Sequence, residues 1–98
     1  MNLPLGAKKW TFAKSVVVLE RDEYGVYELL DSNGIILYIG HGKIMTSLLQ
    51  HLENGTYPIT GARGFSVEYT WDRIKSETRH REELARYYKE YGAYPRFN

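Results

Sequence analysis

The chain has no cysteine, only three prolines and no long apolar run. Without thiols it can form neither disulfides nor thiolate metal sites, and its composition does not indicate a redox compartment. No segment has the length that a membrane-spanning helix needs, and the amino terminus lacks the basic-then-apolar pattern of a signal peptide. We therefore expect a soluble intracellular protein that works in the cytoplasm and not in a membrane.

An excess of charge of one sign is also missing, because 13 Lys and Arg stand against 12 Asp and Glu. The formal net charge of +1 predicts no polyanionic partner, but it excludes none, since binding depends on where charges lie. Aromatic residues are abundant instead, with nine tyrosines and two tryptophans. A phenol suits half-buried positions and the walls of a site, and most of these tyrosines are expected to fill the edge of a small core.

Length and composition indicate one domain over residues 1–98, without a repeat or a linker. Residues 1–14 are expected to form an N-terminal arm that Trp10 and Phe12 anchor. The β-branched run Val16-Val17-Val18 predicts a short strand over residues 15–19.

The strongest local signal is the Asn33-Gly34 pair between two apolar runs, residues 27–30 and 35–39. These two residues tolerate the positive φ of a tight hairpin turn, so the two runs are predicted to pair as antiparallel strands. Gly40 and Gly42 are expected to end the second strand.

Two helices and a further strand are predicted after the hairpin. Apolar residues recur at helical spacing over 44–52, alternate with polar ones over 65–70, and recur again from Asp72 to Gly92. The expected apolar stripe of the last helix consists of Ile74, Leu84, Tyr88 and Tyr91. This order predicts an α+β domain with a small, mainly antiparallel sheet of three to four strands flanked by helices.

The spacing of residues does not match two familiar kinds of site, a nucleotide-binding phosphate loop and a structural zinc site. The segment Gly40-His41-Gly42-Lys43 lacks both the earlier glycine and the following hydroxyl residue of a nucleotide-binding phosphate loop. The three histidines do not match the spacing of zinc ligands. On the last helix, Glu83 shares a stripe with Ser76 and His80, where it is either a half-exposed boundary residue or one of the few protein ligands of a Mg²⁺ ion.

The hairpin carries a pair of similar clusters, Gly25-Val26-Tyr27 and Tyr38-Ile39-Gly40. Together they resemble the paired signature of the GIY-YIG nuclease family. Three later residues fall in that family's order: His51 after the first helix, Glu83 on the last helix, and Asn98 in the Pro95-Arg96-Phe97-Asn98 tail. The resemblance covers residues 24–98 and implies a GIY-YIG-like fold.

The resemblance implies metal-dependent hydrolysis of a nucleic-acid phosphodiester, with Mg²⁺ or another divalent cation as cofactor. Glu83 would hold the metal, and Tyr27 or Tyr38 would help take a proton from the attacking water. His51 would orient that water or relay its proton, and Asn98 would hydrogen-bond within the site. The glycines at both clusters, Gly25 and Gly40, would let backbone and substrate approach closely.

One departure from the family concerns the phosphate clamp. The family has an arginine one turn before the helix histidine, and Ser47 stands there in this chain. A hydroxyl does not stabilise the charge of the transition state as a guanidinium does. Lys43 and Arg63 are the candidates to supply the missing positive charge to the substrate.

Three functions therefore remain open. In the first, the chain is an active metal-dependent endonuclease, with DNA as the favoured substrate. Alternatively, it is a catalytically weak or inactive GIY-YIG-like module that binds nucleic acid or a protein partner. Its basic residues Lys8, Lys9, Lys43 and Arg63 and its tyrosines would make those contacts. In the third case the motif tyrosines only support the fold of an interaction module.

Overall fold

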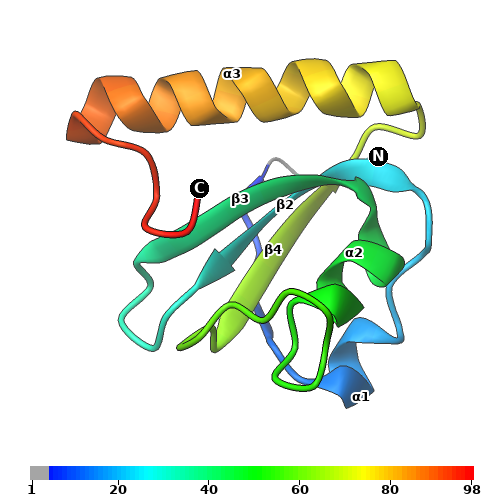
Figure 1. The fold of residues 1–98 in the computed structure, drawn as a ribbon. Helices are drawn as coiled ribbons and strands as arrows, with labels where there is room; N and C mark the ends of the chain where they lie inside the picture. The colour runs from blue at the N-terminus through cyan, green and yellow to red at the C-terminus, as the bar shows by residue number, and fades with distance from the viewer. Residues whose placement is uncertain (1–4) are drawn as a thin grey trace.

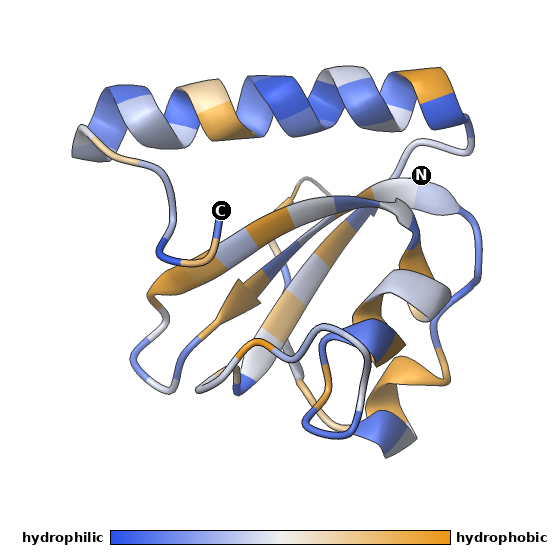
Figure 2. Cartoon of the chain, in the orientation of Figure 1, coloured by the Kyte–Doolittle hydropathy of each residue, from blue (hydrophilic) through white to orange (hydrophobic). Residues whose placement is uncertain are grey.

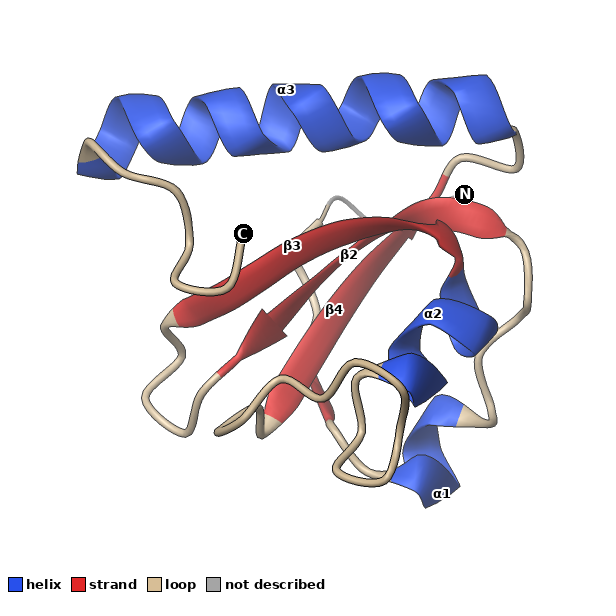
Figure 3. Ribbon diagram, in the orientation of Figure 1, coloured by secondary structure: helices blue, strands red, loops and turns tan. Residues whose placement is uncertain are grey.

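Four strands form one antiparallel sheet in the order β1-β4-β2-β3 in the computed structural model, which describes residues 5–98 (Figure 1). The strands are β1 (Trp10–Thr11), β2 (Tyr24–Leu30), β3 (Ile36–Lys43) and β4 (Gly64–Tyr69). The helices are α1 (Lys14–Val17), α2 (Ile44–Gln50) and α3 (Arg73–Tyr91). Helix α3 crosses one face of the sheet, and α1 and α2 lie on the other (Figures 1 and 3). The predicted α+β class with a small antiparallel sheet is confirmed.

The β2–β3 hairpin turns at the Asn33-Gly34 pair, as predicted. The Asp31 carboxylate accepts the backbone N–H groups of Asn33 and Ile35 at 2.8 and 2.9 Å. Gly34 has a φ of 81°, a conformation that glycine adopts without steric cost. The turn is therefore built by local side-chain and backbone chemistry.

The strands of this hairpin run further than predicted. Gly40 and Gly42 lie inside β3, which continues to Lys43, and Gly42 pairs with Gly25 of β2. A Cβ atom at Gly25 would lie 2.5 Å from the carbonyl oxygen of Glu68 on β4. Gly25 therefore permits close approach of backbones within the sheet. The prediction that Gly40 and Gly42 end the second strand was wrong.

The predicted strand over residues 15–19 is also wrong, because this segment forms the short helix α1. The carbonyl of Ala13 accepts the N–H groups of Val16 and Val17 at 3.0 and 2.9 Å. Val17 is fully buried in the core. A run of three valines has no alternation to set its period, so tertiary burial decides the conformation.

The N-terminal arm contributes the fourth strand. Trp10 and Thr11 pair with Phe65 and Gly64 of β4. The Phe12 ring packs edge-on against Phe65 at 6.1 Å between centroids. Residues 1–4 of the predicted arm lie outside the described residues.

The main hydrophobic core lies between the sheet and the α1–α2 layer. Its buried members are Val17, Tyr27, Leu29, Leu37, Ile44, Leu48, Ile59, Ala62 and Phe65. The loop between α2 and β4 closes this core through Ile59 and Ala62.

The opposite face of the sheet is covered by a hydrophilic helix (Figure 2). Helix α3 begins after Asp72, whose carboxylate accepts a backbone N–H of the first turn, and ends at Gly92 in the left-handed conformation. Its predicted apolar stripe faces largely outward instead of packing on the sheet, and Ile74 is 65% exposed. The residues of α3 that are buried are Ser76 and Glu83. The prediction of the buried face was therefore wrong.

Ion pairs hold α3 to the sheet. Arg79 donates two hydrogen bonds to Glu68 of β4, each 2.9 Å, and one to Glu83 at 2.7 Å. Arg86 donates to the other carboxylate oxygen of Glu83 at 2.6 Å. Charge-assisted bonds of this kind are shorter and stronger than neutral ones.

The C-terminal tail covers the outer edge of β3. The Phe97 N–H donates to the Leu37 carbonyl at 3.0 Å. The Asn98 side chain then accepts the Ile39 N–H at 2.9 Å and donates to the Ile39 carbonyl at 2.8 Å. Figure 1 shows the tail returning from α3 to this strand. Pairing the edge in this way removes free backbone groups that would otherwise recruit another strand.

We expect Asn98→Ala to lower the free energy of unfolding by about 1 kcal/mol, because both bonds to Ile39 are lost. Urea unfolding followed by circular dichroism measures the change. Asn54→Ala, an exposed position in the loop after α2, is the matched control and should change little. Equal effects of the two substitutions would contradict the structural role of Asn98.

A second prediction concerns Glu28, which is buried under α3 with 3% of its surface exposed. The Ser66 hydroxyl donates to its carboxylate at 2.8 Å. Burial raises the pKa of Glu28, and the nearby Glu83 raises it further, against the hydrogen bond from Ser66. A raised folded-state pKa means that stability is lost as pH rises above the ordinary pKa of a glutamate.

Glu28→Gln is therefore expected to raise the free energy of unfolding by roughly 1 kcal/mol at about pH 8. The gain should shrink as pH falls toward about 4 and below, because Glu28 then becomes protonated in the unfolded protein as well as in the folded one. Thermal and urea unfolding across this range measure the difference from wild type. Glu53→Gln, on the exposed loop, is the control. A gain from Glu28→Gln that does not depend on pH, or a loss of stability near pH 8, would contradict the prediction.

Candidate functional site

Three of the sequence-predicted side chains meet on the α2 face of the sheet. The ring centroids of Tyr27 and Tyr38 lie 6.2 Å apart, and those of Tyr38 and His51 lie 5.0 Å apart. The Tyr27 hydroxyl and His51 Nε2 are 2.7 Å apart. β2, β3 and the end of α2 each contribute one of these residues, so the grouping depends on the hairpin and on the seating of α2.

The hydrogen bonds of His51 define its tautomer. Its Nδ1 lies 2.8 Å from the backbone carbonyl of Tyr57, which can only accept, so Nδ1 carries the proton. Nε2 is therefore the acceptor for the Tyr27 hydroxyl. Burial lowers the pKa of His51, opposed by the bond to Tyr57, and the imidazole is neutral at neutral pH.

Both hairpin phenols are also neutral. Burial raises the pKa of Tyr27 far above its ordinary value, and the nearby Tyr38 adds to the rise, while a hydrogen bond from Ser47 opposes it. Burial likewise raises the pKa of Tyr38. Tyr27 is therefore a hydrogen-bond donor to His51, and neither phenol is prepared to act as a phenolate base.

Gly40 makes the position of Tyr27 possible. The two residues pair across β2 and β3, and a Cβ atom at Gly40 would collide with the ring and hydroxyl of Tyr27. It would also lie 2.7 Å from the ring of Tyr38. The glycine of one cluster thus accommodates the tyrosine of the other. Gly25, predicted to admit substrate, faces the backbone of β4 instead.

These residues line a shallow cleft of about 360 Å³, which we call the tyrosine cleft. Its lining consists of Tyr27, Tyr38, His41, Ser47, Gln50, His51, Thr56 and Tyr57. None of these residues is Lys, Arg, Asp or Glu. His41 and Tyr57 were not predicted as parts of a site. His41 lies in the segment that does not match a phosphate loop, and Tyr57 belongs to no motif. Tyr57 is 59% exposed and comes from the loop after α2.

The structure does not bring Glu83 to the tyrosine cleft. Glu83 lies on α3, across the sheet, where its charge interacts with that of Glu28. Glu28 and Tyr27 are neighbours on β2 and so point to opposite faces. Both carboxylate oxygens of Glu83 already accept short bonds from Arg79 and Arg86.

The hydrogen bonds to the Glu83 carboxylate also determine whether this residue can hold the predicted Mg²⁺ ion. A carboxylate that is held on both oxygens by guanidinium groups does not fit a Mg²⁺ ion, which requires free oxygen ligands. Within residues 5–98, no three His, Asp or Glu side chains are grouped as metal ligands. The donor set at Glu83 therefore does not fit the predicted cofactor.

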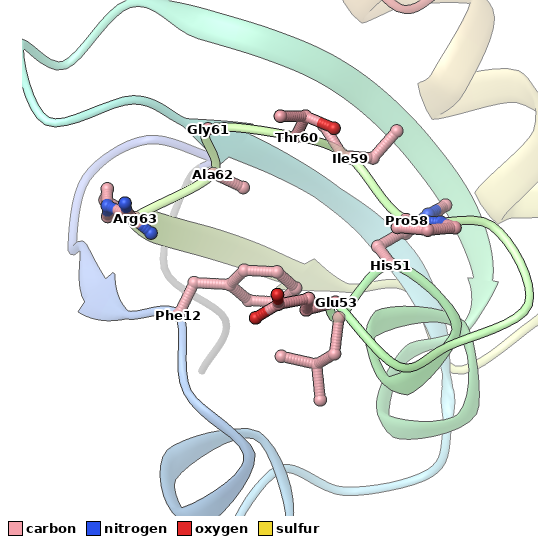
Figure 4. Close-up of a pocket in the computed structure, with 10 residues that line it drawn as sticks. Phe12, His51, Glu53, Pro58, Ile59, Thr60, Gly61, Ala62 and Arg63 are labelled. Atoms are coloured by element: carbon pink, nitrogen blue, oxygen red, sulfur yellow. The ribbon is translucent and has the colours of Figure 1, made fainter.

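Lys43 and Arg63, the candidates to supply positive charge to the substrate, also lie outside the tyrosine cleft. Lys43 Nζ sits 5.1 Å from the centre of the Tyr24 ring. Arg63 lines a separate cavity of about 420 Å³ together with Phe12 and Ile59, and Figure 4 places it at the end away from His51. Neither residue lines the tyrosine cleft, whose lining contains no Lys or Arg.

Asn98, predicted as a catalytic residue, uses both polar atoms of its side chain on the backbone of Ile39. Its role in this structure is to hold the tail on β3. The cleft offers flat aromatic surface and hydrogen-bonding side chains, and none of its lining residues is Lys, Arg, Asp or Glu. This arrangement is suited to binding a planar, polar-edged group.

No helix of residues 5–98 combines the length and the apolar character needed to cross a membrane. Comparison with known proteins found no curated protein and no solved structure that matches the chain. A family model described as "Domain of unknown function (DUF7508)" matches residues 1–91, which include the hairpin, His51 and Glu83. The chain therefore belongs to the DUF7508 family.

Proposed function

We propose that the chain is a GIY-YIG-like module that binds nucleic acid, with DNA favoured, in the cytoplasm, and that it does not hydrolyse phosphodiesters. The observation that carries the proposal is a neutral Tyr27–His51 pair in a cleft whose lining holds no charged Lys, Arg, Asp or Glu. Such a cleft presents ring surfaces to bases but offers no charge to a reacting phosphate.

Hydrolysis would need charge stabilisation that this site lacks. The transition state of phosphodiester cleavage is anionic, and losing one positioned donor from such a site costs about 10²–10³ in rate. Ser47 offers only a hydroxyl where the resembled family has a guanidinium, and Glu83 is bound by two arginines on the far face. Tyr27 stays protonated because burial raises its pKa. These features together favour binding without cleavage.

Base stacking is the interaction that the cleft favours. Tyr57 is 59% exposed at its rim, and Tyr38 is half-buried beside it. Stacking of a base on an aromatic side chain contributes about 1–3 kcal/mol and tolerates any base. Because few cations lie near the cleft, we expect contact mainly with unpaired bases and little with the phosphate backbone.

Tyr57→Ala is expected to weaken binding of a fluorescein-labelled single-stranded DNA about tenfold, because one stacking surface is lost. Fluorescence anisotropy at low salt measures the affinity. Tyr91→Ala is the matched control, since Tyr91 is 62% exposed but lies on α3, away from the cleft. The backbone carbonyl that holds His51 is retained in Tyr57→Ala. Absence of binding by wild type, or equal losses in both variants, would refute the proposal.

The absence of cleavage is tested separately. Supercoiled plasmid incubated with the protein and Mg²⁺ or Mn²⁺ should show no more nicking than a sample with chelator. Gel electrophoresis over a protein titration measures the nicked fraction. Metal-dependent nicking that disappears in Glu83→Gln, in a variant shown by circular dichroism to be folded, would establish the endonuclease and overturn this half of the proposal.

A further inference from the structure

Two histidines far apart in the chain meet at the outer edge of the sheet. His41 lies near the end of β3 and His80 lies in the middle of α3. Their ring centroids are 4.5 Å apart, with an angle of 42° between the rings. His41 is exposed and His80 is half-buried, so solvent reaches the pair from the side of His41.

One nitrogen of His80 is already held by the backbone. Its Nε2 donates to the Ile39 carbonyl at 3.0 Å, which leaves Nδ1 as the nitrogen with a free lone pair. Histidines that bind metals commonly donate their other ring N–H to a carbonyl in this way, because the bond sets the tautomer and the orientation of the ring. Within residues 5–98, no hydrogen-bond partner occupies His80 Nδ1 or the ring of His41.

The third histidine provides an internal contrast. Both nitrogens of His51 are engaged, Nδ1 with the Tyr57 carbonyl and Nε2 with the Tyr27 hydroxyl. His51 therefore has no lone pair to offer a metal ion. Only the His41–His80 pair combines free ring nitrogens, access to solvent and a ring anchored by a backbone carbonyl.

We propose that His41 and His80 together bind a divalent transition-metal ion, with solvent completing the coordination. A zinc-bound imidazole nitrogen lies about 2.0–2.1 Å from the metal, which puts tetrahedrally arranged ring centroids about 5 Å apart. The observed centroid separation of 4.5 Å is close to this value. Imidazole is a ligand for Zn²⁺, Cu²⁺ and Ni²⁺ and not for Mg²⁺, so this site is distinct from the predicted magnesium site.

The surrounding groups affect both the pKa of His80 and the affinity of the site for a metal ion. Burial lowers the pKa of His80, opposed by the bond to Ile39, and the neighbouring His41 and Arg81 lower it further. The lone pair on His80 Nδ1 follows from the hydrogen bond between Nε2 and the Ile39 carbonyl. The positive charge of Arg81 also repels a cation, so we expect a moderate affinity. His41 borders the tyrosine cleft, and a bound ion would add positive charge at its rim.

Isothermal titration of the tag-free protein with ZnCl₂ near neutral pH tests the site. We expect one zinc ion per chain, and a loss of affinity of about tenfold or more in His41→Ala and in His80→Gln. Arg81→Ala should instead bind zinc more tightly, because it removes a repelling charge and no ligand. Zinc binding that survives His41→Ala, or no binding by wild type, would overturn the proposal.

A second measurement separates the site from any loss of folding in the variants. Nitrogen-15 spectra of the histidine rings in the wild-type protein should shift at His41 and His80 when zinc is added, with His51 unchanged. A zinc-induced shift confined to other residues would refute the assignment. The titration needs no nucleic acid, so its failure is distinguishable from failure of the proposed binding function.

Discussion

The fit of the Tyr27 ring against the bare backbone of Gly40 is the constraint on which the site depends. It requires the register in which these two residues face each other across the hairpin, and the turn at Asn33-Gly34 helps to produce that register. With its ring in this place, Tyr27 reaches His51 at 2.7 Å and links the sheet to the end of α2. A side chain larger than hydrogen at position 40 would push the phenol out, and the cleft would lose its wall.

Different interactions hold the helices on the two faces of the sheet. The α1–α2 side buries an apolar core that includes Phe65 and Leu29. The α3 side is joined largely by carboxylates and guanidinium groups, centred on Arg79 and Glu83. Buried ion pairs are orienting contacts more than sources of stability, since the cost of removing charges from water offsets much of their attraction. They place α3 in one position along the sheet, and that position brings His80 to the edge of β3.

The same division separates the residues on which the GIY-YIG resemblance was based. Tyr27, Tyr38 and His51 share one face, but Glu83 belongs to the other and serves as the acceptor for two arginines. The lining of the cleft contains no Lys, Arg, Asp or Glu, and aromatic side chains make up much of it. A metal ion bound by His41 and His80, as proposed, would add positive charge at the border of the cleft.

Local signals in the sequence determined the hairpin, the order of helices and strands from residue 24 onward, and the ends of α3. Asn33-Gly34, Asp72 and Gly92 act within a few residues of themselves, so their effect can be predicted without knowing what packs nearby. The convergence of Tyr27, Tyr38 and His51 was expected only through the family resemblance. The helical form of Val16-Val17 was not predictable, because a short apolar run takes the conformation that its burial favours.

Only the tertiary structure decided which stripe of α3 faces the sheet. Periodicity groups Ser76, His80 and Glu83 on one side of the helix, but hydrophobicity alone assigned the buried side to Ile74 and its neighbours. The side of α3 that faces the sheet is instead polar, and its charged groups find partners in distant parts of the chain. Glu68 of β4, for example, accepts a hydrogen bond from Arg79. A sequence shows which residues share a face, whereas the partner of that face is determined by how distant segments pack.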